Sequence, residues 1–273
     1  MENNARPDVY DVIVIGNGPA GLSAAINVRQ RNGSVLVIGL PQKGSLLYRT
    51  EEIDNYPGLE KISGKELLEK MTKHAADKGA DFVEERVLSA ILLGETWMVS
   101  AGPNVFTGRK VIFAGGVSRG KTYPGEDQFL GRGVSYCATC DGMIYKNKKI
   151  VVIGYSDADQ EEVDFLKGLS PDVHYFRKPR KVTINGEQKV SGLEVDGEQV
   201  EADGIFILRP ALSPSSIFPG LELENGYIKT DENQATNLPG LYAAGDCTGG
   251  LLQVAKAVGE GLIAGQAAMK KTK

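Results

Sequence analysis

Short apolar runs, most of them rich in β-branched residues, predict the buried strands of this chain. They are residues 12–15, 35–38, 111–114, 150–153 and 240–244. A glycine follows each run, and segments with helical periodicity follow several of them. Strands that alternate with helices are typical of an α/β fold. The pattern therefore predicts an α/β protein with two Rossmann-like units, each of which begins with a strand, a turn and a helix.

The first apolar run leads into a glycine pattern. Residues 16–21 read Gly-Asn-Gly-Pro-Ala-Gly, which is the spacing of the dinucleotide-binding fingerprint, and a helical segment over 22–30 follows. In that fingerprint the first glycine makes a tight turn, the second lets the backbone approach a pyrophosphate, and the third packs helix against strand. We therefore expect a bound dinucleotide here. The acidic residue that usually holds the ribose is absent, because Gly39 ends the second strand, so the ribose must have other partners.

The remaining segments of the first half are expected to form helices and strands with a structural role. Residues 63–66 read Ser-Gly-Lys-Glu, a capping box that begins a helix. Residues 82–114 alternate between apolar and polar and contain two glycine turns, which predicts a strand and then a β-meander. Near the other end of the chain, a helix predicted over 254–268 is rich in small residues, which favours close packing against a cofactor or a sheet.

A second strand-turn-helix unit begins at residue 149, but its glycine pattern is altered. Ser156 stands at the position of the second fingerprint glycine, and Asp159 puts a carboxylate in the first helical turn, where it would repel a phosphate. Only one crossover helix is predicted here, whereas a mononucleotide-binding half normally has two βα units. The second nucleotide site is therefore expected to be degraded. The other elements expected in this part are a strand over 173–176 and hairpins with turns at 185–186 and 196–197.

Composition narrows the class of protein. With 41% hydrophobic and 24% charged residues the chain is expected to fold into a packed protein. A formal charge of −4 argues against nucleic acid as the main partner. The sequence has no apolar run of membrane-spanning length and begins with no apolar signal segment, so we expect no membrane association and a cytoplasmic location.

Two of the three cysteines form a Cys-x-x-Cys motif, Cys137 and Cys140. In a reducing compartment this spacing indicates redox chemistry between a dithiol and a disulfide. A zinc site is the alternative, but Cys247 and one histidine would complete an unusual ligand set, so no metal is expected. Cys247 is expected to be a small buried residue. Asp141 is the nearest proton carrier, because neither histidine lies close to the cysteine pair in the sequence.

Five segments, in order along the chain, resemble the low-molecular-weight thioredoxin reductases. They are residues 16–21, 55–58 (Asn-Tyr-Pro-Gly), 137–142 (Cys-Ala-Thr-Cys-Asp-Gly), 221–228 (Leu-Glu-Leu-Glu-Asn-Gly-Tyr-Ile) and 243–246 (Ala-Ala-Gly-Asp). The resemblance implies a homodimer. It also implies an FAD-binding domain made from residues 1–117 and 218–273, with a redox domain over 118–217 inserted between them.

The resemblance further implies the roles of individual residues. Cys140 would lie next to the flavin, Cys137 would attack the disulfide of the partner protein, and Asp141 would be the acid and base. The residues implied for FAD binding are Gly16, Gly18, Pro19, Ala20, Gly21, Gly39, Asn55, Val87, Ala114, Gly115, Gly245, Asp246, Gln253 and Val254.

Departures from this family cluster where it binds NADPH. Residues 177–179, Arg-Lys-Pro, stand where the family has His-Arg-Arg for the 2′-phosphate, and Leu252 replaces an arginine. This pattern resembles the ferredoxin-dependent flavin thioredoxin reductases, a branch that lacks the nicotinamide site. The implied function is FAD-dependent reduction of thioredoxin, or a thioredoxin-like protein, through a Cys137–Cys140 disulfide with electrons from ferredoxin. Two alternatives stay open: an NADPH-dependent thioredoxin reductase that holds the phosphate through basic residues near 177–180, and a flavin-binding redox sensor without turnover.

Overall fold

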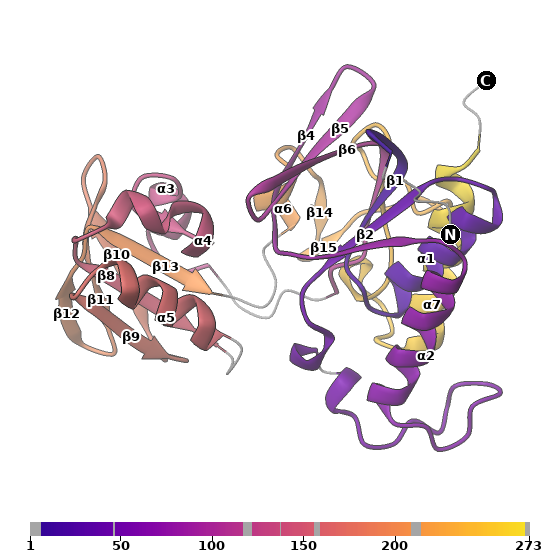
Figure 1. Ribbon diagram of the computed structural model, residues 1–273, viewed down its shortest axis with the longest axis horizontal. Coiled ribbons are helices and arrows are strands. Elements are labelled where there is room, and N and C mark those ends of the chain that lie inside the picture. The colour runs from indigo at the N-terminus through magenta and orange to yellow at the C-terminus, as the bar shows by residue number, and fades with distance from the viewer. Residues whose placement is uncertain are drawn as a thin grey trace. The chain divides into compact units, whose positions relative to one another are not determined.

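The computed structural model describes residues 7–45, 47–116, 122–136, 138–155, 159–208 and 214–270. The chain divides into two compact units, one formed by Met1–Ser118 and Ala211–Lys273, the other by Arg119–Pro210 (Figure 1). The first unit is therefore built from both ends of the chain. The predicted α/β class with Rossmann-like units is confirmed. The assignment of FAD to the first unit and of the redox function to the second stays a prediction.

A seven-stranded sheet forms the centre of the first unit. Its strand order is β3-β2-β1-β6-β5-β4, and β16 pairs with the second half of β6. Strands β3, β2, β1, β6 and β16 run parallel, whereas β4, β5 and the first half of β6 form the predicted antiparallel meander. The strands are β1 (Val9–Ile15), β2 (Val35–Gly39), β3 (Asp81–Glu84), β4 (Val87–Leu93), β5 (Thr96–Ala101), β6 (Asn104–Phe113) and β16 (Leu241–Ala243).

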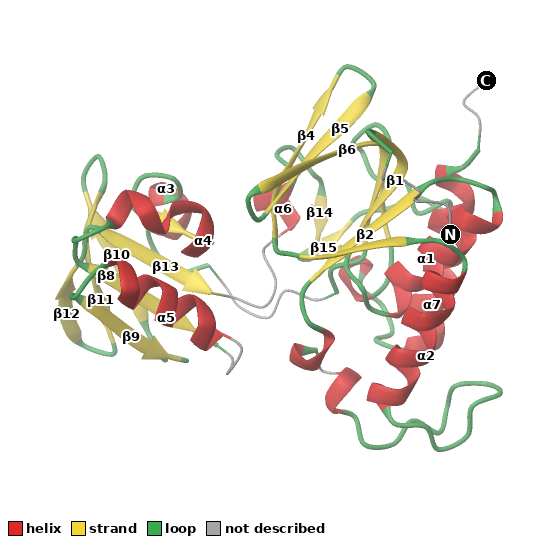
Figure 2. Ribbon diagram, in the orientation of Figure 1, coloured by secondary structure: helices red, strands yellow, loops and turns green. Residues whose placement is uncertain are grey.

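Three helices lie together beside this sheet, α1 (Pro19–Gln30), α2 (Gly64–Asp77) and α7 (Val254–Ala268), as Figure 2 shows. Helix α2 has the predicted cap, because the Ser63 hydroxyl accepts a hydrogen bond from the Glu66 amide at 3.2 Å. Helices α1 and α7 pack with almost no side chain between them. An added Cβ at Gly261 would lie 2.1 Å from the carbonyl oxygen of Ala20. The small residues of α7 are therefore explained by helix contact.

The second unit has a four-stranded parallel sheet in the order β7-β13-β8-β9 and a three-stranded antiparallel sheet β10-β11-β12. Helix α5 (Gln160–Leu169) is the crossover from β8 to β9, as the sequence predicts. Every residue of β8 is buried, which accounts for its continuous apolar run. The strands are β7 (Val134–Ser135), β8 (Ile150–Gly154), β9 (Val173–Arg177), β10 (Val182–Gly186), β11 (Val190–Val195), β12 (Glu198–Glu201) and β13 (Gly204–Leu208).

Several details differ from the sequence-based expectation. The hairpin turn expected at 185–186 falls instead at residues 187–189, because Gly186 stays in β10 and pairs with Val190. The turn at Asp196 and Gly197 is confirmed, and both residues have the positive φ that a tight hairpin turn needs. Short elements without a clear periodicity were not predicted. They include β7 and also α3 (Glu126–Phe129), α4 (Ala138–Asp141), α6 (Pro214–Ile217), β14 (Leu223–Glu224), β15 (Tyr227–Ile228) and the 3-10 helices η1 (Gln42–Gly44), η2 (Leu47–Arg49), η3 (Gly142–Tyr145) and η5 (Asp246–Thr248).

None of the helices in the described ranges combines the length and the apolar character needed to cross a membrane.

Candidate functional site

The turn between β1 and α1 contains three glycines with different surroundings. At Gly16, where φ is +114°, an added Cβ would lie 2.2 Å from the carbonyl oxygen of Ala114. At Gly21 it would lie 1.9 Å from the carbonyl oxygen of Gly16. At Gly18 it would meet no atom within 4 Å, so the backbone there borders open space. The first and third glycines are thus required by the packing of the chain, and the second leaves room for a ligand.

Helix α1 begins at this turn, and its N-terminus suits an anion. Gly18 is the N-cap, Pro19 begins the helix, and the first turn carries no acidic residue. The backbone N–H groups and the dipole of a 12-residue helix favour negative charge at this end. The turn and the helix together therefore fit the pyrophosphate of a dinucleotide.

Other predicted cofactor residues meet at the same place. The Ala114 amide donates to the carbonyl oxygen of Ile15 at 2.7 Å, which brings the end of β6 beside the end of β1. At Gly245, where φ is +89°, an added Cβ would lie 2.8 Å from the Cβ of Ala20. Gly115 follows Ala114 directly. The structure therefore brings the ends of β1, β6 and β16 together around the start of α1.

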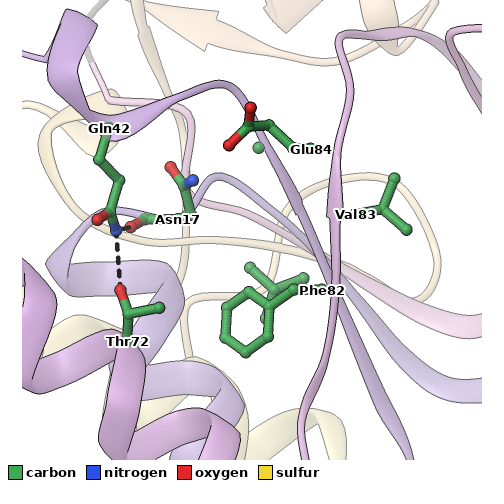
Figure 3. A pocket seen from close by; sticks show the side chains of 8 residues that line it. Asn17, Gln42, Thr72, Phe82, Val83 and Glu84 are labelled. Carbon is green, nitrogen blue, oxygen red and sulfur yellow. Dashed lines mark hydrogen bonds between the residues drawn. The ribbon is translucent and has the colours of Figure 1, made fainter.

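A cavity of about 240 Å³ lies beside the glycine turn, at the ends of β2 and β3 (Figure 3). The Asn17 amide donates to the carbonyl oxygen of Leu40 at 2.8 Å. The Gln42 amide donates to the carbonyl oxygen of Asn17 at 2.7 Å and to the Thr72 hydroxyl at 3.0 Å. These bonds give one part of the cavity a fixed polar wall. Its lining residues are Asn17, Val37, Gly39, Gln42, Thr72, Phe82, Val83 and Glu84.

Two predicted cofactor residues that are far apart in the sequence are joined. The Asn55 amide donates to the side-chain oxygen of Gln253 at 2.9 Å. Gln253 is the N-cap of α7, and Val254 is the first residue of that helix. Val87 lies elsewhere, buried at the start of β4, and is not among the described residues that line the cavity.

An ion pair holds the turn at Gly245 and Asp246 against α7. The Lys256 ammonium lies 3.1 Å from the Glu260 carboxylate and donates to the carbonyl oxygens of Gly245 at 2.9 Å and Gly249 at 2.6 Å. The same Glu260 carboxylate accepts from the Gly245 amide at 2.8 Å. The two charged side chains are 21% and 18% exposed, so water screens them little. This network fixes the backbone next to Asp246, and the sequence pattern did not predict it.

Replacing Lys256 by methionine is expected to destabilise the protein by roughly 2 kcal/mol, because Glu260 would keep its charge without its main partner in a partly buried site. We also expect weaker flavin retention, since the turn over residues 245–249 loses the three hydrogen bonds that Lys256 donates to it. Denaturant unfolding and the flavin-to-protein ratio measure the two effects. The matched control is Lys70→Met, because Lys70 pairs with Glu66 at the same 3.1 Å distance but both side chains are more than half exposed, so a change below about 0.5 kcal/mol is expected. Equal effects of the two substitutions would contradict the role of the network.

Burial shifts the pKa values of two side chains near this turn. Burial raises the pKa of the Asp246 carboxyl; Lys256 opposes the shift and Glu260 adds to it. Burial also raises the pKa of the Cys247 thiol to about 12. That thiol donates to the carbonyl oxygen of Ala244 at 3.3 Å. Cys247 is therefore a buried structural residue that does not form a thiolate at neutral pH, as its expected role requires.

The cysteine motif is only partly described. Cys137 lies outside the described residues, and Cys140 belongs to α4, of which the backbone alone is described at that position. Asp141, at the end of α4, accepts a hydrogen bond from the Ser135 hydroxyl at 2.6 Å. The Ala138 amide donates to the Glu162 carboxylate of α5 at 3.1 Å. Both sides of the motif are thus held by carboxylates. Among the described residues, no group of three His, Cys, Asp or Glu side chains is placed to bind a metal.

The second strand-turn-helix, after β8, is occupied by its own side chains. An added Cβ at Gly154 would lie 2.7 Å from the Tyr175 ring and 2.8 Å from the Asp159 carboxylate. Asp159 is buried and accepts a hydrogen bond from the Tyr155 amide. Ser156, the altered glycine position, lies outside the described residues. Gly154 stands at the first fingerprint position, which makes the tight turn, so a carboxylate and a phenol ring pack against this turn, and the carboxylate would repel a nearby phosphate.

The comparisons with known proteins agree with this geometry. The family model of the pyridine nucleotide-disulphide oxidoreductases matches residues 10–156 and 170–261. A thioredoxin reductase of Listeria innocua is 34% identical, with 96% of this chain and 93% of that protein covered. A ferredoxin-flavin thioredoxin reductase from Clostridium acetobutylicum superposes with a TM-score of 0.91 at 35% identity, with 96% of each chain covered. A thioredoxin reductase from Gloeobacter violaceus gives 0.84 at 30% identity, with 95% and 93% covered.

The chain therefore belongs to the pyridine nucleotide-disulphide oxidoreductase family. More narrowly, it is a flavin disulfide oxidoreductase of the thioredoxin reductase type, and its cofactor is FAD. The residues around the first glycine turn fit that cofactor, because Gly18 leaves open space and α1 begins without an acidic side chain. FAD, when bound, supplies a store of two electrons that can be filled one at a time or together.

Proposed function

We propose that this protein reduces thioredoxin, or a thioredoxin-like protein, through the Cys137–Cys140 pair. The pair as a disulfide takes up two electrons and two protons and becomes a dithiol. The Cys137 thiolate then attacks one sulfur of the partner's disulfide, and a mixed disulfide forms as the partner's other sulfur leaves as a thiolate. Cys140 attacks that mixed disulfide, which restores the Cys137–Cys140 disulfide and releases the reduced partner.

We propose that Asp141 gives and takes the proton in these thiol exchange steps. Its carboxyl group follows Cys140 directly and is held by the Ser135 hydroxyl at 2.6 Å. A carboxyl group oriented in this way can give a proton to a leaving thiolate and take one from an attacking thiol. In the first unit, the proposed FAD residues are those of the glycine turn, the Gly245–Asp246 turn, and the linked pair Asn55 and Gln253.

We propose ferredoxin as the electron donor. The observation that carries this choice is the turn after β8, where Tyr175 and Asp159 lie against Gly154. Two further carboxylates, Glu161 and Glu162, lie in the first turn of α5, so a nucleotide phosphate would meet negative charge at the helix end that normally attracts it. The similarity to a ferredoxin-flavin thioredoxin reductase supports the same choice.

The second candidate donor is NADPH. It is favoured by the relatives that are named only as thioredoxin reductases, and by the basic residues Arg177, Lys178 and Arg180. These side chains offer positive charge for a 2′-phosphate, but the Asp159 carboxylate beside Gly154 and the acidic first turn of α5 would repel a pyrophosphate. The two donors therefore make different predictions for the purified flavoprotein.

Anaerobic addition of micromolar NADPH is expected to leave the flavin absorbance unchanged over many minutes, whereas reduced ferredoxin bleaches it. Absorbance spectra of the purified, flavin-loaded protein, recorded over time, measure both reactions. The control is an NADPH-dependent thioredoxin reductase under the same conditions, in which NADPH should bleach the flavin rapidly. Rapid bleaching of the flavin by NADPH would contradict the proposal that ferredoxin is the electron donor.

The redox-sensor alternative is tested by following thioredoxin itself. With a donor that reduces the flavin, an enzyme forms reduced thioredoxin catalytically, whereas a sensor forms at most one reduced thioredoxin, which is two thiols, per cysteine pair. The expected homodimer stays a prediction, which light scattering coupled to size-exclusion chromatography measures.

A further inference from the structure

The end of β2 lacks the acidic residue that usually holds a dinucleotide ribose, and the structure shows why. An added Cβ at Gly39 would lie 2.6 Å from the Cγ of Asn17. The Asn17 side chain is held there, because its Nδ2 donates to the backbone carbonyl oxygen of Leu40. The Gln42 side chain donates to the backbone carbonyl oxygen of Asn17, which holds the turn itself. A larger residue at position 39 would therefore displace Asn17 from the glycine turn. A carboxylate at this edge of the sheet would then come from another strand.

Glu84 lies on that neighbouring strand. Strands β2 and β3 run parallel, and Gly39 is paired in register with Glu84, the last residue of β3. The Glu84 side chain is exposed and lines the same cavity as Asn17, and Figure 3 shows both side chains directed into one space. One strand over from the usual position, the sheet thus presents a carboxylate at the same level along the strands.

The chemistry of the cavity suits a nucleoside. Val37 and Phe82 give it an apolar surface that a flat purine ring can cover, whereas Glu84, Asn17 and Thr72 provide polar groups. A carboxylate only accepts hydrogen bonds, and the vicinal hydroxyls of a ribose are uncharged donors. A phosphate at this position would be repelled by Glu84, so the cavity selects the sugar and base end of a dinucleotide.

We propose that Glu84 replaces the missing acidic residue at position 39 and accepts hydrogen bonds from the ribose hydroxyls of the adenosine half of FAD. The inference rests on the proposed function in one respect, namely that the glycine turn of the first unit holds the FAD pyrophosphate. From that turn, the ends of β2 and β3 are the adjacent part of the sheet, where the adenosine half of a dinucleotide binds in this type of fold.

Titration of the flavin-free protein with FAD tests this role. Glu84→Gln keeps the size and one acceptor but removes the charge, and it is expected to weaken FAD binding about 10-fold, which corresponds to about 1.4 kcal/mol. FMN lacks the adenosine half, so its affinity should not change. Glu85→Gln is the matched control, because the Glu85 carboxylate lies beside Gly102 and not in the cavity, and it should bind FAD like the wild type.

A competition experiment tests directly whether Glu84 binds the 2′-hydroxyl of the ribose. Against bound FAD, ADP should compete better than 2′-deoxy-ADP in the wild type, and the difference should be lost in Glu84→Gln. Unchanged FAD affinity in the variant, an equal loss for FMN, or unchanged discrimination between the two nucleotides would each overturn the proposal. Because these titrations use no electron donor and no thioredoxin, failure of the proposed electron route leaves their result intact. Wild-type protein that binds no FAD would instead refute the proposed function.

Discussion

Serine at position 137 is expected to abolish thioredoxin reduction while the flavin is still reduced by its donor. A serine hydroxyl does not ionise at neutral pH and cannot exchange with a disulfide, so the step that joins the two proteins is lost. We expect a fall in turnover of at least about 1000-fold, as is usual when a catalytic nucleophile is removed. The measurement follows thioredoxin thiols with reduced ferredoxin as the donor, next to flavin absorbance in the same sample.

Substitutions of the other two cysteines test the same assignment of roles. Cys140→Ser is expected to be equally inactive but to trap thioredoxin on Cys137, because the thiol that resolves the mixed disulfide is gone; a reducible band of the summed mass would show this. Cys247→Ser should keep turnover within about 2-fold, since a thiol with a pKa of about 12 has no thiolate to offer. If Cys137→Ser retained full turnover, or Cys247→Ser lost it, the assigned roles would be wrong.

The scaffold of the cysteine motif consists of contacts that its sequence spacing does not reveal. Glu126 is fully buried and accepts from the Tyr136 hydroxyl at 2.9 Å and from the Tyr123 amide at 2.8 Å, just before Cys137. Glu162 reaches the Ala138 amide from another helix. The spacing of Cys137 and Cys140 predicts redox chemistry, but a buried and a half-buried carboxylate from other segments, Glu126 and Glu162, hold the motif, and a single sequence gives no signal for such pairs.

The strand-turn-helix of the first unit could be predicted because local geometry leaves few choices. Gly16 and Gly21 stand where a Cβ would meet a backbone oxygen, and such requirements appear directly in the sequence as glycine. The buried parallel strands could be recognised for a similar reason, since strands covered on both faces need apolar residues throughout. In both cases the residues that the packing requires lie within one short segment of the sequence.

Contacts that depend on register or on distant segments could not be predicted. Glu84 is paired with Gly39 only because β3 lies beside β2, and the hydrogen bond from Asn55 to Gln253 joins positions 198 residues apart. One feature of the sequence does point to the Lys256–Glu260 pair. These two residues supply the charges on a helix that is otherwise rich in small residues. Recognising its role required the position of the Gly245 turn, which tertiary packing determines.

The largest expected effect on folding comes from Gly21→Ala. The new Cβ would lie 1.9 Å from the carbonyl oxygen of Gly16, which is backbone and cannot rotate away, so α1 must move off the sheet. We expect a loss of about 3 kcal/mol or more in the free energy of unfolding of the flavin-free protein, at the upper end of overpacking effects. Urea unfolding of the flavin-free protein measures this loss without any contribution from ligand binding.

Gly18→Ala, three residues away in the same turn, is expected to behave in the opposite way. Its φ of −83° suits alanine and its Cβ would meet no atom within 4 Å, so the stability of the flavin-free protein should be unchanged or higher by up to about 1 kcal/mol. FAD affinity should fall at least about 10-fold, because the methyl group enters the space that the pyrophosphate needs. If Gly18→Ala instead bound FAD normally, the pyrophosphate would lie elsewhere, and the first glycine turn would have only a structural role. A stability loss that appears with Gly21→Ala and an affinity loss that appears with Gly18→Ala would separate the glycine that the fold requires from the glycine that the cofactor requires.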